Sequence, residues 1–155
     1  MITIITGNIN SQKTTKMIEH YKQHHQGDGF VSLKVMREEG VDHYDIMKLS
    51  NHQKKVLMIH EQQFNNHQDS SILIGPYHVI KESILWVEDE IKEMIKRKIS
   101  PIYLDEIGML ELKNEGFHRI LTEMIHSKLD LVLVIRDKFR QEVISKYHME
   151  DIFLV

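Results

Sequence analysis

The chain has 155 residues, of which 41% are hydrophobic and 28% charged, so it is long enough for one globular domain with a substantial core. A net charge of −3 argues against a general affinity for nucleic-acid backbone, and the absence of cysteine excludes disulfides and thiolate metal sites. No segment reaches the roughly 18 apolar residues of a membrane span. Residues 1–6 do not form a signal peptide. We therefore expect a cytoplasmic protein without a membrane partner, and the sequence identifies no protein partner.

The N-terminal half alternates short apolar runs with polar segments. The apolar or alternating runs predict strands at 2–6, 30–36, 44–49, 55–60 and 72–74. The glycine, asparagine and serine content of 7–12 predicts a loop, and the apolar spacing of 13–25 predicts a helix. A polar turn joins the third and fourth of these strands, which indicates a hairpin, and 61–71 is a polar loop.

The C-terminal half contains the longest helical pattern, 79–98, whose isoleucine, valine and methionine residues form one stripe and which ends before Pro101. The segment 101–112 begins as a buried strand and leaves it at two acidic residues. The remaining patterns predict a helix at 114–127, a strand at 129–135, a helix at 137–148 and a last strand at 152–155. Strands alternating with helices predict an α/β fold with a mostly parallel sheet, a small β-hairpin insertion and a single domain over 1–155.

The stretch "TGNINSQKTT" (6–15) lies between the first strand and the first helix. In the phosphate-binding pattern G-x-x-x-x-G-K-[ST], Gly7 fills the first position and Lys13 and Thr14 the last two. Lys13 would reach the β- and γ-phosphates, and the Thr14 hydroxyl would bind Mg²⁺. The simpler interpretation is a surface turn in which Ser11 or Thr14 caps the helix. The residues predicted to contact the nucleotide are Gly7, Asn8, Ile9, Asn10, Ser11, Gln12, Lys13, Thr14 and Thr15.

Asp105 and Glu106 stand at the carboxyl end of an apolar strand, where ligands gather in open α/β sheets. An aspartate there can hold Mg²⁺ through water, and the adjacent carboxylate can polarise an attacking water. Alone, the pair could be two ordinary acids in a loop. Together with the lysine–threonine loop, it predicts a nucleotide site. Arg136 or Arg140 could contact the γ-phosphate, although solvated arginines at a helix start are more common.

The stretch "DEIGMLEL" (105–112) resembles the DEIG-x-MEL signature of the THEP1-type nucleoside triphosphatases, a branch of the P-loop NTPases. The segments 29–49 and 75–80 and the position of Phe117 are also similar to that family, so the resemblance spans nearly the whole chain. It implies a RecA-like α/β domain that hydrolyses ATP, GTP or other nucleoside triphosphates to the diphosphate and phosphate with Mg²⁺. It also implies that Lys13 and Glu106 are catalytic, and that Thr14 and Asp105 serve the metal.

The loop departs from the family pattern G-x-x-G-x-G-K-T-T, because Asn10 and Gln12 replace two glycines. If the position of Gln12 needs a left-handed backbone, the strain is roughly 1–2 kcal/mol. A roughly tenfold to hundredfold loss of nucleotide affinity would follow from such changes. The family's R-x-G-F-like element is also missing, because the matching stretch reads "VDHYD".

Three functions remain open at this point. The first is a slow Mg²⁺-dependent NTPase, and the second is a regulatory module that binds nucleotide with little or no hydrolysis. The third is a small P-loop kinase, for which the sequence shows no acceptor pocket. The presence of Lys13, Thr14, Asp105 and Glu106 favours the NTPase.

Overall fold

The computed structural model describes residues 1–8, 12–38, 40–61 and 71–155. Its strands are β1 (Ile2–Gly7), β2 (Asp28–Arg37), β3 (Gly40–Lys48), β4 (Lys54–His60), β5 (Ser71–Ile74), β6 (Tyr77–Ile80), β7 (Ile102–Ile107), β8 (Leu131–Arg136) and β9 (Ile152–Leu154). Its helices are α1 (Lys13–His24), α2 (Lys81–Lys96), α3 (Met109–Leu112), α4 (His118–His126), the short 3-10 helix η2 (Asp137–Phe139) and α5 (Arg140–Lys146). Most of the predicted polar loop, residues 62–70, lies outside the described residues.

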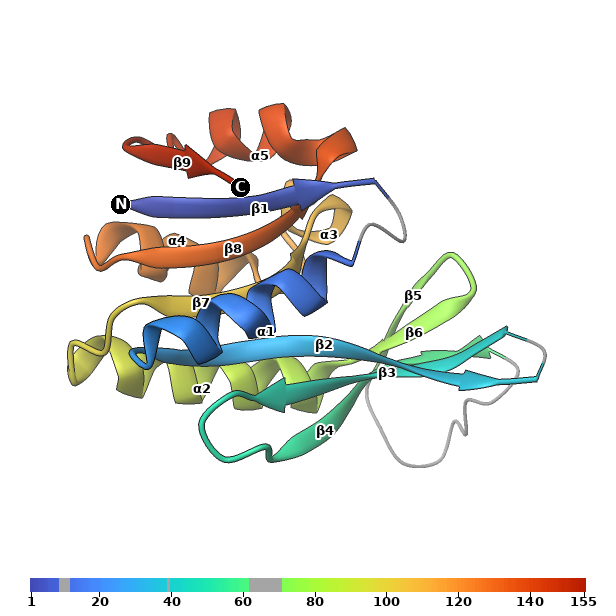
Figure 1. Ribbon diagram of the computed structural model, residues 1–155. Helices are drawn as coiled ribbons and strands as arrows, with labels where there is room; N and C mark the ends of the chain where they lie inside the picture. Colours follow the sequence, from blue (N-terminus) through green and yellow to red (C-terminus); the bar gives the residue numbers. More distant parts are fainter. Residues whose placement is uncertain (9–11, 39, 62–70) are drawn as a thin grey trace.

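All nine strands form one sheet in the order β5-β6-β4-β3-β2-β7-β8-β1-β9. The five strands from β2 to β9 in this order pair in parallel, whereas β3, β4, β6 and β5 extend the sheet in antiparallel fashion. The predicted α/β fold with a parallel sheet centre and a hairpin is therefore confirmed, and the hairpin is β3–β4. In Figure 1, β3 and β4 lie below the parallel strands, and β5 and β6 rise on the right.

The start of the long helix differs from the prediction. Residues Tyr77–Ile80 form β6, which pairs with β4 and β5, and α2 begins only at Lys81. Ile80 has an extended backbone, with φ −85° and ψ 113°. The apolar residues Val79 and Ile80 continue the helical stripe in sequence, so periodicity alone does not separate the strand from the helix.

Two helical layers cover the opposite faces of the sheet. Helix α1 lies in front of the sheet in Figure 1 and packs Met17 against Ile5 and Val134. Helices α2, α4 and α5 contribute to the larger core cluster on the other face, which contains Ile4 and Leu133. Because side chains alternate along a strand, the neighbours Ile4 and Ile5 belong to different clusters.

The parallel strands bring three segments to one edge of the sheet. Strand β8 lies between β1 and β7 and pairs Gly7 with Arg136 and Ile107 with Ile135. Strand β2 pairs with β7 over Asp28–Phe30. The end of β1, the acidic residues of β7 and the middle of β2 are consequently neighbours at the carboxyl edge, on the right in Figure 1.

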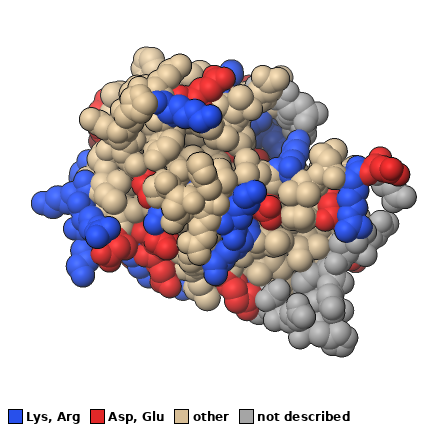
Figure 2. Space-filling model, turned by 60° about the horizontal axis from the view of Figure 1, so that its bottom comes forward, with Lys and Arg blue, Asp and Glu red and all other residues tan. Residues whose placement is uncertain are grey.

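Basic and acidic side chains are interspersed over the described residues on the face that Figure 2 shows. That face offers no broad basic surface to a nucleic-acid backbone. Within the described part of the chain, no helix has the length and apolar character needed to cross a membrane.

Gly29 allows β2 to approach β7 closely. A Cβ at this position would lie 2.1 Å from the backbone oxygen of Tyr103. We predict that Gly29→Ala lowers the free energy of unfolding by roughly 3 kcal/mol, because two backbones must separate. Urea denaturation monitored by circular dichroism measures this loss.

Gly75→Ala is the matched control, because Gly75 also has a positive φ (+55°) but no described atom lies within 4 Å of the point that a Cβ would occupy there. It should cost only about 1 kcal/mol of backbone strain. Equal losses in the two variants would contradict the close approach of β2 and β7.

Candidate active site

The carboxylate of Asp105 joins three segments that are distant in sequence. Its side chain is fully buried at the end of β7. Oδ2 accepts hydrogen bonds from Thr14 Oγ1 (2.7 Å) and from the backbone N–H of Ser32 (3.0 Å). Oδ1 accepts one from the backbone N–H of Glu106 (2.8 Å). One carboxylate thus connects the first turn of α1, the middle of β2 and the turn that ends β7.

Burial makes the charged form of Asp105 costly. Desolvation of the buried carboxylate is the larger cause and the negative charge of Glu106 the smaller one, and together they raise the pKa of Asp105 to about 7. The hydrogen bonds from Ser32, Thr14 and Glu106 oppose this shift, because they favour the carboxylate. A positive charge beside Asp105 would therefore stabilise the ionised carboxylate at neutral pH.

Gln12 has a left-handed backbone, with φ 62° and ψ 33°. The strain that the sequence analysis attached to this conformation, roughly 1–2 kcal/mol, therefore applies to the folded chain. The Gln12 carbonyl accepts the hydrogen bond from Lys16 N (3.0 Å) that opens α1. Ile9, Asn10 and Ser11, predicted as phosphate contacts, lie outside the described residues.

The Lys13 side chain is partly buried at the start of α1, and its Nζ donates to the backbone oxygen of Asn8 (2.7 Å). Burial is the main effect on this ammonium group and lowers its pKa. The nearby acids Glu106 and Asp105 raise this pKa, and the nearby cations Arg136 and Lys34 lower it further. The effect of Glu106 is the largest of the four, followed by those of Arg136, Asp105 and Lys34. Lys13 and the two predicted acids therefore lie within electrostatic reach of one another.

Glu106 occupies an irregular point in its strand. The pairing of β7 with β8 skips from Leu104 to Ile107, so Asp105 and Glu106 lie in a bulge. Glu106 is exposed and has a left-handed backbone with φ 64°. Such a conformation is uncommon for glutamate and costs of order 1–3 kcal/mol, and it often occurs at functional sites.

A cavity of about 400 Å³ opens between α1, β2, β3 and the end of β7. Its volume is within the usual range for small-molecule sites. It brings together the predicted residues Lys13, Thr14 and Glu106. The complete lining is Gln12, Lys13, Thr14, Thr15, Ser32, Leu33, Lys34, Tyr44 and Glu106.

Three further residues of the cavity, Ser32, Lys34 and Tyr44, belong to no motif in the sequence. Lys34 and Tyr44 are directly opposite each other in the β2–β3 pair. Burial, then the nearby Tyr77 and Glu106, raise the pKa of Tyr44 to about 12. Both strands were predicted, but only the pairing of β2 with β7, which are distant in sequence, brings these side chains to the end of β7.

The two arginines considered above have different surroundings. Arg136 is paired with Gly7 in the sheet, and its charge lowers the pKa of both Lys13 and Tyr44. Arg140 instead forms an ion pair with Asp137 (3.2 Å). Of the two, Arg136 is therefore the one that acts on the residues of the cavity.

Glu111 holds the chain that follows Glu106. Its carboxylate is buried and accepts hydrogen bonds from the backbone N–H groups of Gly108 (2.7 Å) and Phe117 (2.9 Å). A Cβ on Gly116 would lie 2.4 Å from Glu111 Oε2, so glycine is needed for this close contact. Glu111 therefore ties the turn after β7 to the start of α4.

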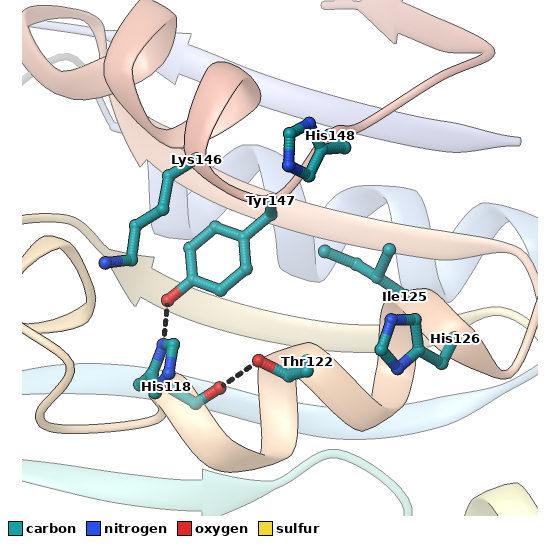
Figure 3. A pocket seen from close by; sticks show the side chains of 7 residues that line it. All are labelled: His118, Thr122, Ile125, His126, Lys146, Tyr147 and His148. Carbon is teal, nitrogen blue, oxygen red and sulfur yellow. Dashed lines mark hydrogen bonds between the residues drawn. The ribbon is translucent and has the colours of Figure 1, made fainter.

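A second pocket, of about 320 Å³, lies between α4 and the end of α5 (Figure 3). The Tyr147 hydroxyl donates to the backbone oxygen of Glu111 (3.1 Å). Because that proton is committed, His118 Nδ1 is the donor in its 2.7 Å bond to Tyr147, drawn as a dashed line in Figure 3. This pair holds the main chain of Glu111, in addition to the bonds of its carboxylate.

Comparison with known proteins gives one family and two similar structures. A family model described as NTPase matches residues 2–155. THEP1 from the hyperthermophile Aquifex aeolicus is similar in structure, with a TM-score of 0.68, 19% sequence identity, and coverage of 100% of this chain and 88% of that chain. A human cancer-related nucleoside triphosphatase gives a TM-score of 0.64 and 19% identity, with coverage of 98% and 86%. A search of curated proteins finds no match. The structural likeness confirms the predicted P-loop NTPase fold.

We predict a pH-dependent stability contribution from Glu111. Burial raises the pKa of Glu111 from its ordinary value of 4.5 to about 7, against its backbone hydrogen bonds. Between these pH values the folded state binds more protons than the unfolded state. The contribution of Glu111 to the free energy of unfolding is therefore fully present below pH 4.5 and is lost as pH rises through 7. Glu111→Gln should therefore destabilise the protein more at pH 5 than at pH 8, by up to about 3 kcal/mol. Urea unfolding across this pH range measures the difference.

Glu115→Gln is the control, because Glu115 is an exposed acid in the same segment. Because the side chain is exposed, this variant should lose far less stability at pH 5 than Glu111→Gln. A gap between the parent protein and Glu111→Gln that is constant from pH 5 to pH 8 would contradict the prediction.

Proposed function

Because the chain belongs to the NTPase family, we propose that it is a Mg²⁺-dependent nucleoside triphosphatase that hydrolyses ATP or GTP to the diphosphate and phosphate. The proposal treats residues 1–155 as one P-loop domain. The observation that supports it most is the 2.7 Å hydrogen bond between Thr14 and Asp105, beside a cavity that Lys13 and Glu106 also line or reach. Thr14 and Asp105 are distant in the sequence, so only the fold brings them together.

The proposed metal site fits the chemistry of its residues. Mg²⁺ prefers oxygen ligands and is usually held by one or two protein groups together with phosphates and waters. Thr14 offers a hydroxyl and Asp105 a buried carboxylate whose ionised form needs a nearby positive charge. When bound, the ion would neutralise charge on the phosphates. Thr14 would bind it, and Asp105 would hold it directly or through water.

Lys13 and the start of α1 would bind the triphosphate. The N-terminus of this 12-residue helix carries backbone N–H groups and a partial positive charge that favour anions. The Lys13 ammonium can exchange its bond to the Asn8 oxygen for the β- and γ-phosphates. Arg136, at the neighbouring strand end, adds positive charge.

Glu106 would orient the attacking water. It lines the cavity beside Thr14 and close to Lys13, and its carboxylate can accept a proton from a water placed in line with the γ-phosphate. A module that only binds nucleotide has no need for a strained glutamate at this point. The left-handed backbone of Glu106 therefore favours hydrolysis over simple binding.

We predict that Glu106→Gln lowers kcat roughly 10²-fold or more and leaves nucleotide affinity nearly unchanged, because only the water loses its acceptor. Phosphate release gives kcat, and calorimetry with a non-hydrolysable triphosphate analogue gives affinity. Glu115→Gln, which alters an exposed acid of the same segment, should leave both unchanged. If Glu106→Gln leaves a measurable hydrolysis rate untouched, the catalytic assignment is wrong.

We predict that Gln12→Gly raises the free energy of unfolding by about 1 kcal/mol, because glycine adopts the left-handed conformation without strain. Gln12 also lines the cavity, so loss of its side chain should make room for the phosphates and raise triphosphate affinity. The expected gain is less than roughly tenfold, which corresponds to less than about 1.4 kcal/mol. Denaturation and calorimetry measure the two effects.

Gln12→Ala separates the two causes, because alanine removes the side chain but keeps the backbone strain. It should raise affinity without raising stability. Weaker binding in Gln12→Gly would instead mean that the glutamine side chain contributes to nucleotide binding.

A further inference from the structure

Ser32 carries a buried hydroxyl that the fold does not satisfy. The residue is 4% exposed in the middle of β2, and its Oγ has no hydrogen-bond partner among the described residues. Burial of such a group without a partner costs about 1–3 kcal/mol, so native proteins rarely leave one unpaired. The buried Ser83 shows the usual solution, because its Oγ donates to the backbone oxygen of Val56.

The residue that carries this hydroxyl lies beside the proposed metal site. The backbone N–H of Ser32 donates to Asp105 Oδ2, the same oxygen that accepts the Thr14 hydroxyl. Ser32 and Thr14 therefore approach one carboxylate oxygen from two different elements, β2 and α1. Both residues also line the 400 Å³ cavity with Lys13 and Glu106.

We propose that Ser32 Oγ is a ligand of the divalent cation, a third protein group beside Thr14 and Asp105. The inference rests on the proposed function, since it concerns the same cation. It accounts for a serine at a strand position whose neighbours are the apolar Val31 and Leu33, where an apolar side chain would avoid the cost of the unpaired hydroxyl.

The chemistry of the hydroxyl suits this role. Mg²⁺ and Mn²⁺ accept neutral oxygen ligands, and a hydroxyl adds no charge to a site that already contains Asp105 and Glu106. Loss of one neutral ligand weakens metal binding but leaves the loop and the helix N-terminus available to the phosphates. Metal affinity and nucleotide affinity should therefore respond differently to a change at Ser32.

The experiment measures Mn²⁺ binding by electron paramagnetic resonance in the complex of the whole chain with a non-hydrolysable ATP analogue. Ser32→Ala should raise the Kd for Mn²⁺ roughly tenfold, the usual scale for loss of one ligand-shell group. Its affinity for the analogue in the presence of a chelator should equal that of the parent protein. Thr14→Ala should show a loss of metal affinity at least as large, and Ser145→Ala, an exposed serine on α5, should show none.

Ser32→Cys tests direct contact, because it changes little in size and replaces oxygen with a softer sulfur ligand. It should shift the ratio of Cd²⁺ to Mn²⁺ affinity in favour of Cd²⁺ by roughly tenfold or more, as expected for a thiolate ligand. A merely structural serine would give no such change of metal preference.

An unchanged Kd for Mn²⁺ in Ser32→Ala, or an unchanged metal preference in Ser32→Cys, would overturn the inference. If the parent protein binds metal and nucleotide together while both variants behave like it, only the role of Ser32 fails. If the parent protein binds no divalent cation with the analogue, the proposed function fails as well.

Discussion

The buried carboxylate of Asp105 is the interaction on which the rest of the site depends. Its three donors come from α1, β2 and the end of β7, so the group can be buried only when these elements have assembled. A buried charge needs partners, and the fold supplies them from three directions. Its hydrogen bonds therefore fix the positions of Thr14, Ser32 and Glu106. Assembly of these three elements on folding also assembles the site.

Two of the described non-glycine residues with left-handed backbones lie at this site. Gln12 and Glu106 both line the cavity, and both have left-handed backbones. Strained residues persist only where surrounding contacts hold them. On the β7 side these contacts include the Asp105 bond to Glu106 N and the Glu111 bond to Gly108 N, which act on either side of the strained residue. The start of α1 holds Gln12 through its carbonyl.

The sequence contained enough to predict the parts of the site that local chemistry defines. A strand, a polar loop and Lys13-Thr14 at a helix start predict a phosphate cradle, and an apolar strand that ends in Asp105-Glu106 predicts its acidic side. Whether position 12 needs a left-handed backbone was left open by the sequence, and the structure shows that Gln12 has one. Parallel pairing then explains why the two segments lie at one edge of the sheet.

The remaining parts depend on tertiary structure. Ser32, Lys34 and Tyr44 reach the cavity because β2 pairs with β7 as well as with β3, and the pairing of β2 with β7 joins segments that are distant in sequence. Strand β6 was merged with α2, because Val79 and Ile80 extend the helical stripe and only pairing with β4 and β5 makes them a strand. Glu111 lies within the recognised motif, but its role as a buried link between Gly108 and Phe117 follows only from their distances.

The most direct test of the account is phosphate release from ATP and GTP, with and without Mg²⁺ and without any added acceptor, compared between the parent protein and Asp105→Asn. The account predicts release by the parent protein that requires the metal. It predicts that Asp105→Asn lowers this release by roughly 10²-fold or more, because the amide can neither balance the cation's charge nor accept all three hydrogen bonds. Release that does not depend on Mg²⁺, or that persists in Asp105→Asn, would contradict it. A parent protein that releases no phosphate without an acceptor would contradict it as well.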